Sequence, residues 1–132
     1  MTQEQKNLLL KDLCSRLPYG VKGVNKAGIV TDPSDWYCGF VRLSKALENR
    51  ICYSDWRPYL FPLDSITIEQ ERELSKLGVS YCEYALHDDT RGLGIMVDEA
   101  YIFFEFCYKH HIDFLGLIDM GVAIDATGKN IY

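Results

Sequence analysis

The sequence predicts a single α+β domain over residues 1–132. Segments with helical spacing and capping patterns lie at the start of the chain and in its second half. The stretch between them is rich in β-branched and aromatic residues interrupted by turn signals. At 132 residues the chain has the length of one ordinary domain, and two independent cores would leave each half marginally stable.

The first predicted element is a helix over residues 2–17. Thr2 and Gln5 form a capping-box pattern, which satisfies free amides of the first turn. Asp12 and Arg16 fall outside the apolar stripe that we expect the helix to bury. That stripe follows i, i+3, i+4, i+7 spacing and consists of Leu10, Leu13, Cys14 and Leu17.

Residues 21–56 are predicted to form an antiparallel β-meander of four short strands, and closure into a small SH3-like barrel is one arrangement it could take. Residues 57–66 follow as a Pro-rich crossing. Pro58 and Pro62 each fix φ and push the preceding residue out of the helical region. We interpret this extended, apolar segment as the place where the two halves of the chain dock.

The second half is predicted to contain two helices packed with a short β-hairpin. The first helix spans 67–77, with a second capping-box pattern at Thr67 and a C-terminal glycine, Gly78. The hairpin spans 79–97 and the second helix 98–111. Residues 112–132 form a compact tail.

Cysteine usage indicates a protein of a reducing compartment. The five cysteines are an odd number without close pairs, which argues against a disulfide framework and a structural zinc site and for buried free thiols. No signal-peptide core and no membrane-spanning run is visible, so we expect a cytoplasmic protein without membrane contact. The net charge of −5 is uneven: residues 16–57 carry seven Lys and Arg against four Asp and Glu, and the rest carries seven against fifteen.

Candidate catalytic residues are few. A metal-dependent hydrolase is a distant alternative that would use His87, Asp88, His110 and Asp113. Histidines near the end of a helix more commonly stabilise its negative end. We therefore predict no catalytic residue, no bound metal and no cofactor.

The leading functional hypothesis is an accessory protein without catalytic activity that acts by contact with an unknown protein partner. It rests on the aromatic excess of the crossing and of helix 98–111. The alternative is a small nucleic-acid-binding module, because stacking aromatics with flanking cations on a sheet are typical of single-strand binders. The candidate binding residues for these two hypotheses are Arg50, Trp56, Arg57, Tyr59, Phe103, Phe104 and Tyr108. The sequence does not fix an oligomeric state.

Three segments resemble a family of small uncharacterised proteins from gut Bacteroidetes and their phages or mobile elements. The segments are Leu13–Lys22, Arg57–Leu63 leading into Thr67, and Gly116–Ala123, which together cover about a quarter of the chain. This family has no assigned activity, so the resemblance implies no site residue. It implies an origin in phages or mobile elements, where small accessory proteins that bind other proteins are common.

Overall fold

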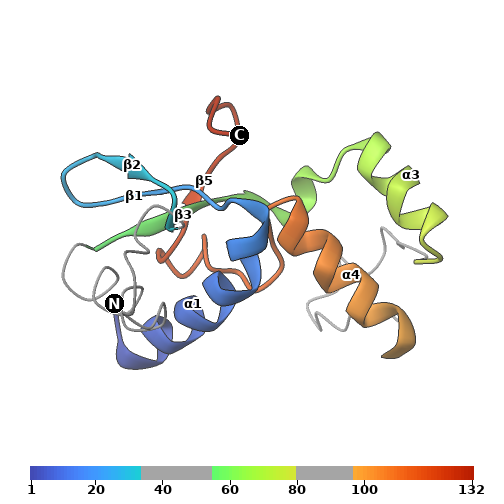
Figure 1. Ribbon diagram of the computed structural model, residues 1–132, viewed down its shortest axis with the longest axis horizontal. Helices are drawn as coiled ribbons and strands as arrows, with labels where there is room; N and C mark the ends of the chain where they lie inside the picture. Colours follow the sequence, from blue (N-terminus) through green and yellow to red (C-terminus); the bar gives the residue numbers. More distant parts are fainter. Residues whose placement is uncertain (34–54, 80–96) are drawn as a thin grey trace.

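The structure, a computed structural model, describes residues 1–33, 55–79 and 97–132 (Figure 1). It confirms an α+β fold in which helices pack with a mixed sheet of five short strands. The elements in chain order are α1 (Gln3–Arg16), the 3-10 turn η1 (Leu17–Tyr19), β1 (Gly23–Val24), β2 (Val30–Thr31), β3 (Arg57–Pro62), the 3-10 turn η3 (Leu63–Ser65), α3 (Ile68–Lys76), α4 (Val97–Lys109), β4 (Ile112–Asp113) and β5 (Ile124–Asp125).

Helix α1 begins as predicted but buries a different face. Thr2 N–H donates to Gln5 Oε1 at 2.8 Å and Gln5 N–H donates to Thr2 Oγ1 at 3.2 Å, which completes the capping box. The buried residues are Leu9, Asp12, Leu13 and Arg16. This face is turned by one residue from the predicted stripe, so Cys14 is exposed. The expectation that Asp12 and Arg16 lie off the buried face is therefore wrong.

Helix α3 also follows its local signals. Thr67 and Gln70 form the second capping box. At the other end Gly78 adopts a φ of +87°, and Val79 N–H donates to the Leu74 carbonyl at 3.1 Å. Together with the bond from Gly78 N–H to the Ser75 carbonyl, this completes a Schellman motif. Leu74 and Val79 are both buried in one apolar cluster, which fixes how the chain leaves the helix.

The segment predicted as a crossing between two halves is instead the central strand, β3. It pairs with β1 in the antiparallel direction and with β4 and β5 in the parallel direction. Tyr59 N–H donates to the Lys22 carbonyl and Phe61 N–H to the His111 carbonyl. Because these amides are two residues apart, β1 and β4 lie one after the other along the same edge of β3. The Leu60 carbonyl accepts from Ala126 N–H on the opposite edge, where β5 pairs.

Successive backbone amides of a strand point to opposite edges, which explains why two prolines are tolerated in the central strand β3. The backbone nitrogens of Pro58, Leu60 and Pro62 all face the β5 edge. The β5 ladder contacts Tyr59 and Leu60, so neither proline removes an amide that the sheet requires.

The predicted meander is confirmed only in its first part, the β1–β2 hairpin. Positions 34–54, which include the other predicted strands, lie outside the described residues, as does most of the predicted hairpin 79–97. The sheet is mixed rather than antiparallel throughout, which differs from an SH3-like barrel. The helix predicted at 98–111 begins at Val97 and ends at Lys109, and the tail contributes β4 and β5 to the sheet.

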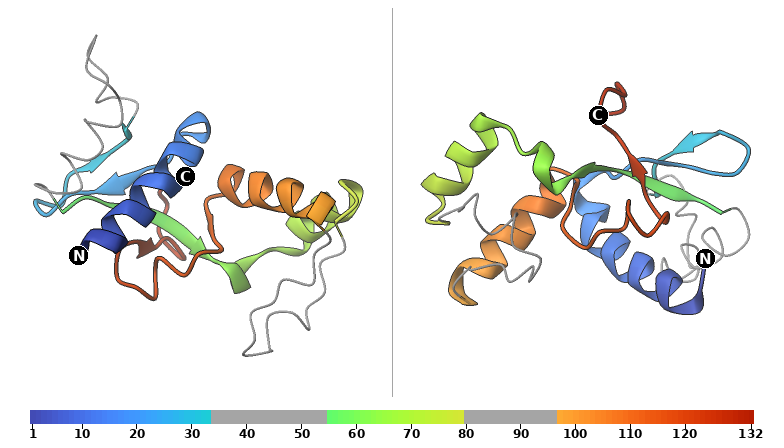
Figure 2. Two further views of the ribbon diagram at one scale, coloured as in Figure 1. Left: turned by 90° about the horizontal axis from the view of Figure 1, so that it is seen from below. Right: turned by 180° about the vertical axis from the view of Figure 1, so that it is seen from behind.

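Two apolar clusters form the core. The first joins α1 to the sheet through Leu9, Leu13, Val21, Trp56, Leu60, Leu117, Val122 and Ala123. The second joins α3 to α4 through Leu74, Val79, Phe103, Phe106, Cys107 and Ile112. Gly23 allows β1 to lie directly against the Trp56 indole, because a Cβ there would come within 2.3 Å of Trp56 Cζ2. Helix α1 lies along β1 and β3, whereas α3 and α4 lie at the opposite end of the molecule from the β1–β2 hairpin (Figures 1 and 2).

Candidate functional site

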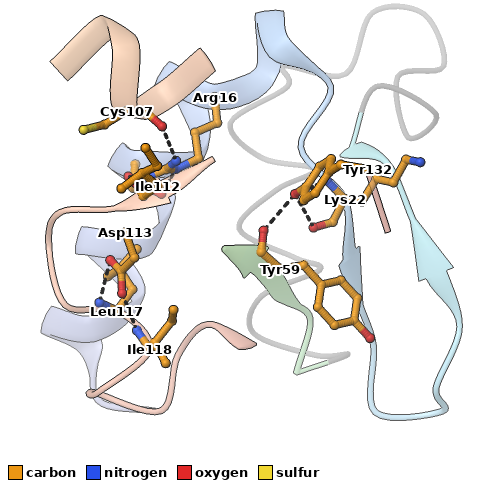
Figure 3. A network of polar contacts seen from close by, with 10 residues as sticks. Arg16, Lys22, Tyr59, Cys107, Ile112, Asp113, Leu117, Ile118 and Tyr132 are labelled. Carbon is orange, nitrogen blue, oxygen red and sulfur yellow. Dashed lines mark hydrogen bonds and ion pairs between the residues drawn. The ribbon is translucent and has the colours of Figure 1, made fainter. Parts of the chain in front are cut away.

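A buried ion pair between Asp12 and Arg16 connects the two apolar clusters. Arg16 Nε lies 2.6 Å from Asp12 Oδ2, and both side chains are fully enclosed. The guanidinium also donates to the carbonyls of Cys107 at 3.2 Å and Ile112 at 2.9 Å (Figure 3). A buried charge needs both a counter-ion and hydrogen bonds, and Arg16 has both.

The electrostatics of the pair indicate a structural role. Burial raises the pKa of Asp12 above its ordinary value, and the adjacent Arg16 guanidinium opposes that rise. Arg16 donates to the chain just before and just after the turn that ends α4, so it holds α1, α4 and β4 together. Asp113 in β4 fixes the next turn by accepting from Leu117 N–H at 2.9 Å and Ile118 N–H at 2.7 Å.

His111 is a second buried polar residue, and its conformation is unusual. It is 6% exposed and has a φ of +57°, a left-handed conformation that costs a residue with a side chain about 1–2 kcal/mol. Its ring stacks on Tyr132 with centroids 4.0 Å apart and an interplanar angle of 13°. The buried Nδ1 has no hydrogen-bond partner within the described part of the chain. Burial and, secondarily, the nearby Arg16 charge lower the pKa of His111 to about 4.

This lowered pKa predicts an acid-sensitive stability. The folded pKa lies below the ordinary value near 6.5, so the unfolded chain binds the proton more tightly and stability falls as the pH drops from 6.5 towards 4. The contribution of His111 at pH 5 relative to pH 7.5 is about 2 kcal/mol of lost stability. Urea denaturation of the wild type and His111→Asn at both pH values measures it, since asparagine tolerates the left-handed conformation. An equal loss of stability in both proteins would contradict the assignment.

Tyr132 covers His111 and reaches the sheet. Its hydroxyl donates to the Tyr59 carbonyl at 2.7 Å and accepts from Lys22 N–H at 3.1 Å. Lys22 Nζ donates to the Ile131 carbonyl at 2.8 Å. Burial of the hydroxyl raises the pKa of Tyr132 to about 12, so the phenol is un-ionised and can both donate and accept.

The structure encloses three of the predicted binding residues. Trp56 is 1% exposed, Tyr59 8% and Phe103 0%, so these rings belong to the core and do not offer a stacking surface. Phe104 and Tyr108 are half-buried, and both rings contact Phe114.

Of the two cations among the predicted binding residues, one lies within the described residues. Arg57 is part-exposed with its guanidinium 4.0 Å from the Asp55 carboxylate, and Arg50 lies outside the described residues.

The structure does not bring together the described residues of the hydrolase alternative. His110 Nε2 contacts Glu73 at 3.0 Å, whereas both carboxylate oxygens of Asp113 accept backbone amides. His87 and Asp88 lie outside the described residues. Across residues 1–33, 55–79 and 97–132, no group of three or more His, Cys, Asp or Glu is placed to hold a metal ion. Cys107 is buried and its pKa is raised to about 12 by that burial, which disfavours the reactive thiolate.

The β1–β2 hairpin carries exposed apolar side chains that were expected to belong to a strand but not to a binding site. Ile29 is 56% exposed and Val30 47%. Asn25 N–H donates to the Ile29 carbonyl, so the residues that bond across the hairpin are Asn25 with Ile29 and Gly23 with Thr31. By alternation, the N–H and C=O of Val30 face away from β1. The only signal in the sequence was a pair of adjacent β-branched residues, Ile29 and Val30, directly after a turn.

The described helices are all too short or too polar to cross a membrane. Comparisons with protein-family models, curated proteins and solved structures give no significant match to this chain.

Proposed function

We propose that the protein is a cytoplasmic accessory protein that binds another protein and catalyses no reaction. The contact is made by strand addition, in which an extended segment of the partner pairs with β2. The observation that carries this proposal is the outward-facing backbone of Val30, flanked by the exposed side chains of Ile29 and Val30.

The hairpin is preorganised for such a contact. The Asn25 side-chain oxygen accepts from the amides of Ala27 and Ile29, both at 3.0 Å, and Gly28 takes a φ of +78° that closes the turn. A preorganised edge loses little conformational entropy when a partner binds. Residues 29–31 carry no charge and no proline, the two features that most commonly protect an edge strand from pairing.

The burial of Trp56 and Tyr59 favours a protein partner over a nucleic acid, because their rings are not available for stacking on bases. Both described cysteines are free thiols, which supports a reducing compartment, although only Cys107 is buried as expected and Cys14 is exposed.

Site-specific photo-crosslinking tests the proposal. A benzoyl-phenylalanine at position 29 is compared, in cells of the source organism, with one at position 68. Ile68 is 64% exposed and belongs to α3, the helix at the opposite end of the molecule from the β1–β2 hairpin (Figure 1). We expect one discrete protein adduct from position 29 and none from position 68.

A matched pair of substitutions identifies the mode of contact. Val30→Pro removes the outward N–H without touching the bonds to β1, whereas Val30→Thr keeps it. We expect the adduct from position 29 to disappear in Val30→Pro and to persist in Val30→Thr. An adduct that survives Val30→Pro would contradict strand addition. Binding of labelled single-stranded RNA that weakens linearly with the logarithm of salt concentration would instead favour the nucleic-acid alternative.

A further inference from the structure

The Tyr132 hydroxyl occupies a position in the sheet that a backbone hydrogen bond would normally fill. The β1–β3 register places Lys22 opposite Tyr59, and Tyr59 N–H donates to the Lys22 carbonyl at 2.8 Å. In an antiparallel pair of this kind the return bond runs from Lys22 N–H to the Tyr59 carbonyl. Here the phenol stands between those two groups, accepting from one at 3.1 Å and donating to the other at 2.7 Å.

The Tyr132 hydroxyl lies at the point along β3 where the neighbouring strand changes from β1 to β4. The Lys22–Tyr59 pair is the last contact of β1, and His111, two residues further along the edge, begins the contact with β4. The gap between β1 and β4 is filled by the Tyr132 ring, which stacks on His111 and lies 5.9 Å from the Phe61 ring centroid. Figure 3 shows the hydroxyl directed between Lys22 and Tyr59. We call this arrangement of Lys22, Tyr59, Phe61 and His111 the tyrosine seat.

The seat recognises more than an aromatic ring. Its two backbone groups require a hydroxyl that donates and accepts, and Lys22 Nζ binds the carbonyl of the preceding residue, Ile131. The Lys22 ammonium also lies 6.0 Å from the centre of the Tyr132 ring. The complementary ligand is therefore a tyrosine together with the backbone carbonyl before it.

The present occupant is attached by a short, exposed segment. Residues 127–130 are exposed, and a turn from the Ala126 carbonyl to Lys129 N–H precedes the bound pair Ile131–Tyr132. Tyr132 as a whole residue remains 42% exposed. Segments with so few buried contacts open at a small fraction of the free energy of global unfolding. Opening would leave the Tyr59 carbonyl and the Lys22 amide without this partner, so the empty seat favours a replacement of the same chemistry.

We propose that the tyrosine seat is a binding site for a tyrosine presented by an extended segment of a protein partner, and that Tyr132 occupies it in the absence of that partner. The inference rests on the proposed function in that the partner is a protein. The seat is distinct from the β2 edge, so binding of a tyrosine to the seat can be measured independently of strand addition at β2.

Peptide titration tests the seat directly. The probe is the tetrapeptide with the sequence of residues 129–132, amidated at its C-terminus and carrying a fluorophore on its N-terminus, and binding is followed by fluorescence anisotropy. We expect it to bind Tyr132→Ala at least about tenfold more tightly than the wild type, whose own Tyr132 competes for the seat. The same peptide with phenylalanine in place of tyrosine is expected to bind Tyr132→Ala about tenfold more weakly, because the two backbone groups stay unpaired.

Three results would overturn the proposal: equal binding to the wild type and Tyr132→Ala, equal binding of the two peptides, or no binding by a folded Tyr132→Ala protein. If circular dichroism shows that Tyr132→Ala does not fold, the titration uses Tyr132→Phe, which keeps the ring and lacks the hydroxyl, with the same criteria. Val30→Pro serves as the control. It is expected to leave peptide binding unchanged, so the failure of one proposal is distinguishable from the failure of the other.

Discussion

Arg16→Met is expected to lower the free energy of unfolding by about 3–5 kcal/mol, because it leaves the Asp12 carboxylate buried without a counter-ion. The carbonyls of Cys107 and Ile112 would lose their donor in the same substitution. Urea denaturation at pH 7 measures the loss. Lys11→Met is the matched control, since Lys11 is the exposed neighbour of Asp12 on α1, and it is expected to change stability by less than about 0.5 kcal/mol.

The double variant Asp12→Leu/Arg16→Met separates the two causes of this loss. It removes both charges and leaves only the two carbonyls without their donor, so we expect it to be more stable than Arg16→Met alone. If Arg16→Met alone were as stable as the wild type, the ion pair would not be what holds α1 to α4 and β4.

Trp56→Ala is expected to destabilise the protein by about 3–5 kcal/mol, the cost of removing a large aromatic ring from a core. Trp56 is 1% exposed, contacts the cluster between α1 and the sheet, and donates from Nε1 to Thr31 Oγ1 at 3.1 Å. Thermal or urea denaturation measures the effect.

Arg57→Ala provides the comparison, because Arg57 is adjacent in sequence but part-exposed, and its ion pair with Asp55 is worth at most about 1 kcal/mol. If Trp56→Ala instead kept full stability and lost affinity for single-stranded RNA, the ring would be a binding residue rather than a core residue.

Local signals in the sequence predicted the ends of α1 and α3 because capping depends on residues only three positions apart. Thr2 with Gln5, and Thr67 with Gln70, need no tertiary information to form their boxes. The buried face of α1 could not be predicted in the same way. Asp12 and Arg16 are charged, and what allows their burial is a pair of carbonyls about ninety residues away in the chain.

The central position of β3 in the sheet could not be predicted from the sequence for a related reason. Pro58 and Pro62 argue against a central strand unless one knows which edge each nitrogen faces. That depends on the placement of β4 and β5, which follow β3 by some fifty residues and more. Parallel pairing of such short, distant strands leaves no local signal.

The candidate sites were the least predictable part of the molecule. Aromatic composition placed Trp56, Tyr59 and Phe103 among the binding residues, but composition does not distinguish a ring in a core from a ring on a surface. The seat of Tyr132 depends on the β1–β3 register and on the left-handed conformation of His111, and neither follows from sequence spacing.

Backbone amide exchange of β2 in the isolated protein and in its partner complex tests strand addition most directly. The Val30 amide faces away from β1, so it is expected to exchange rapidly in the isolated chain and to become at least about tenfold more protected when the partner's strand pairs with it. Protection that arises only on α3 and α4, with the Val30 amide unchanged, would contradict strand addition at β2.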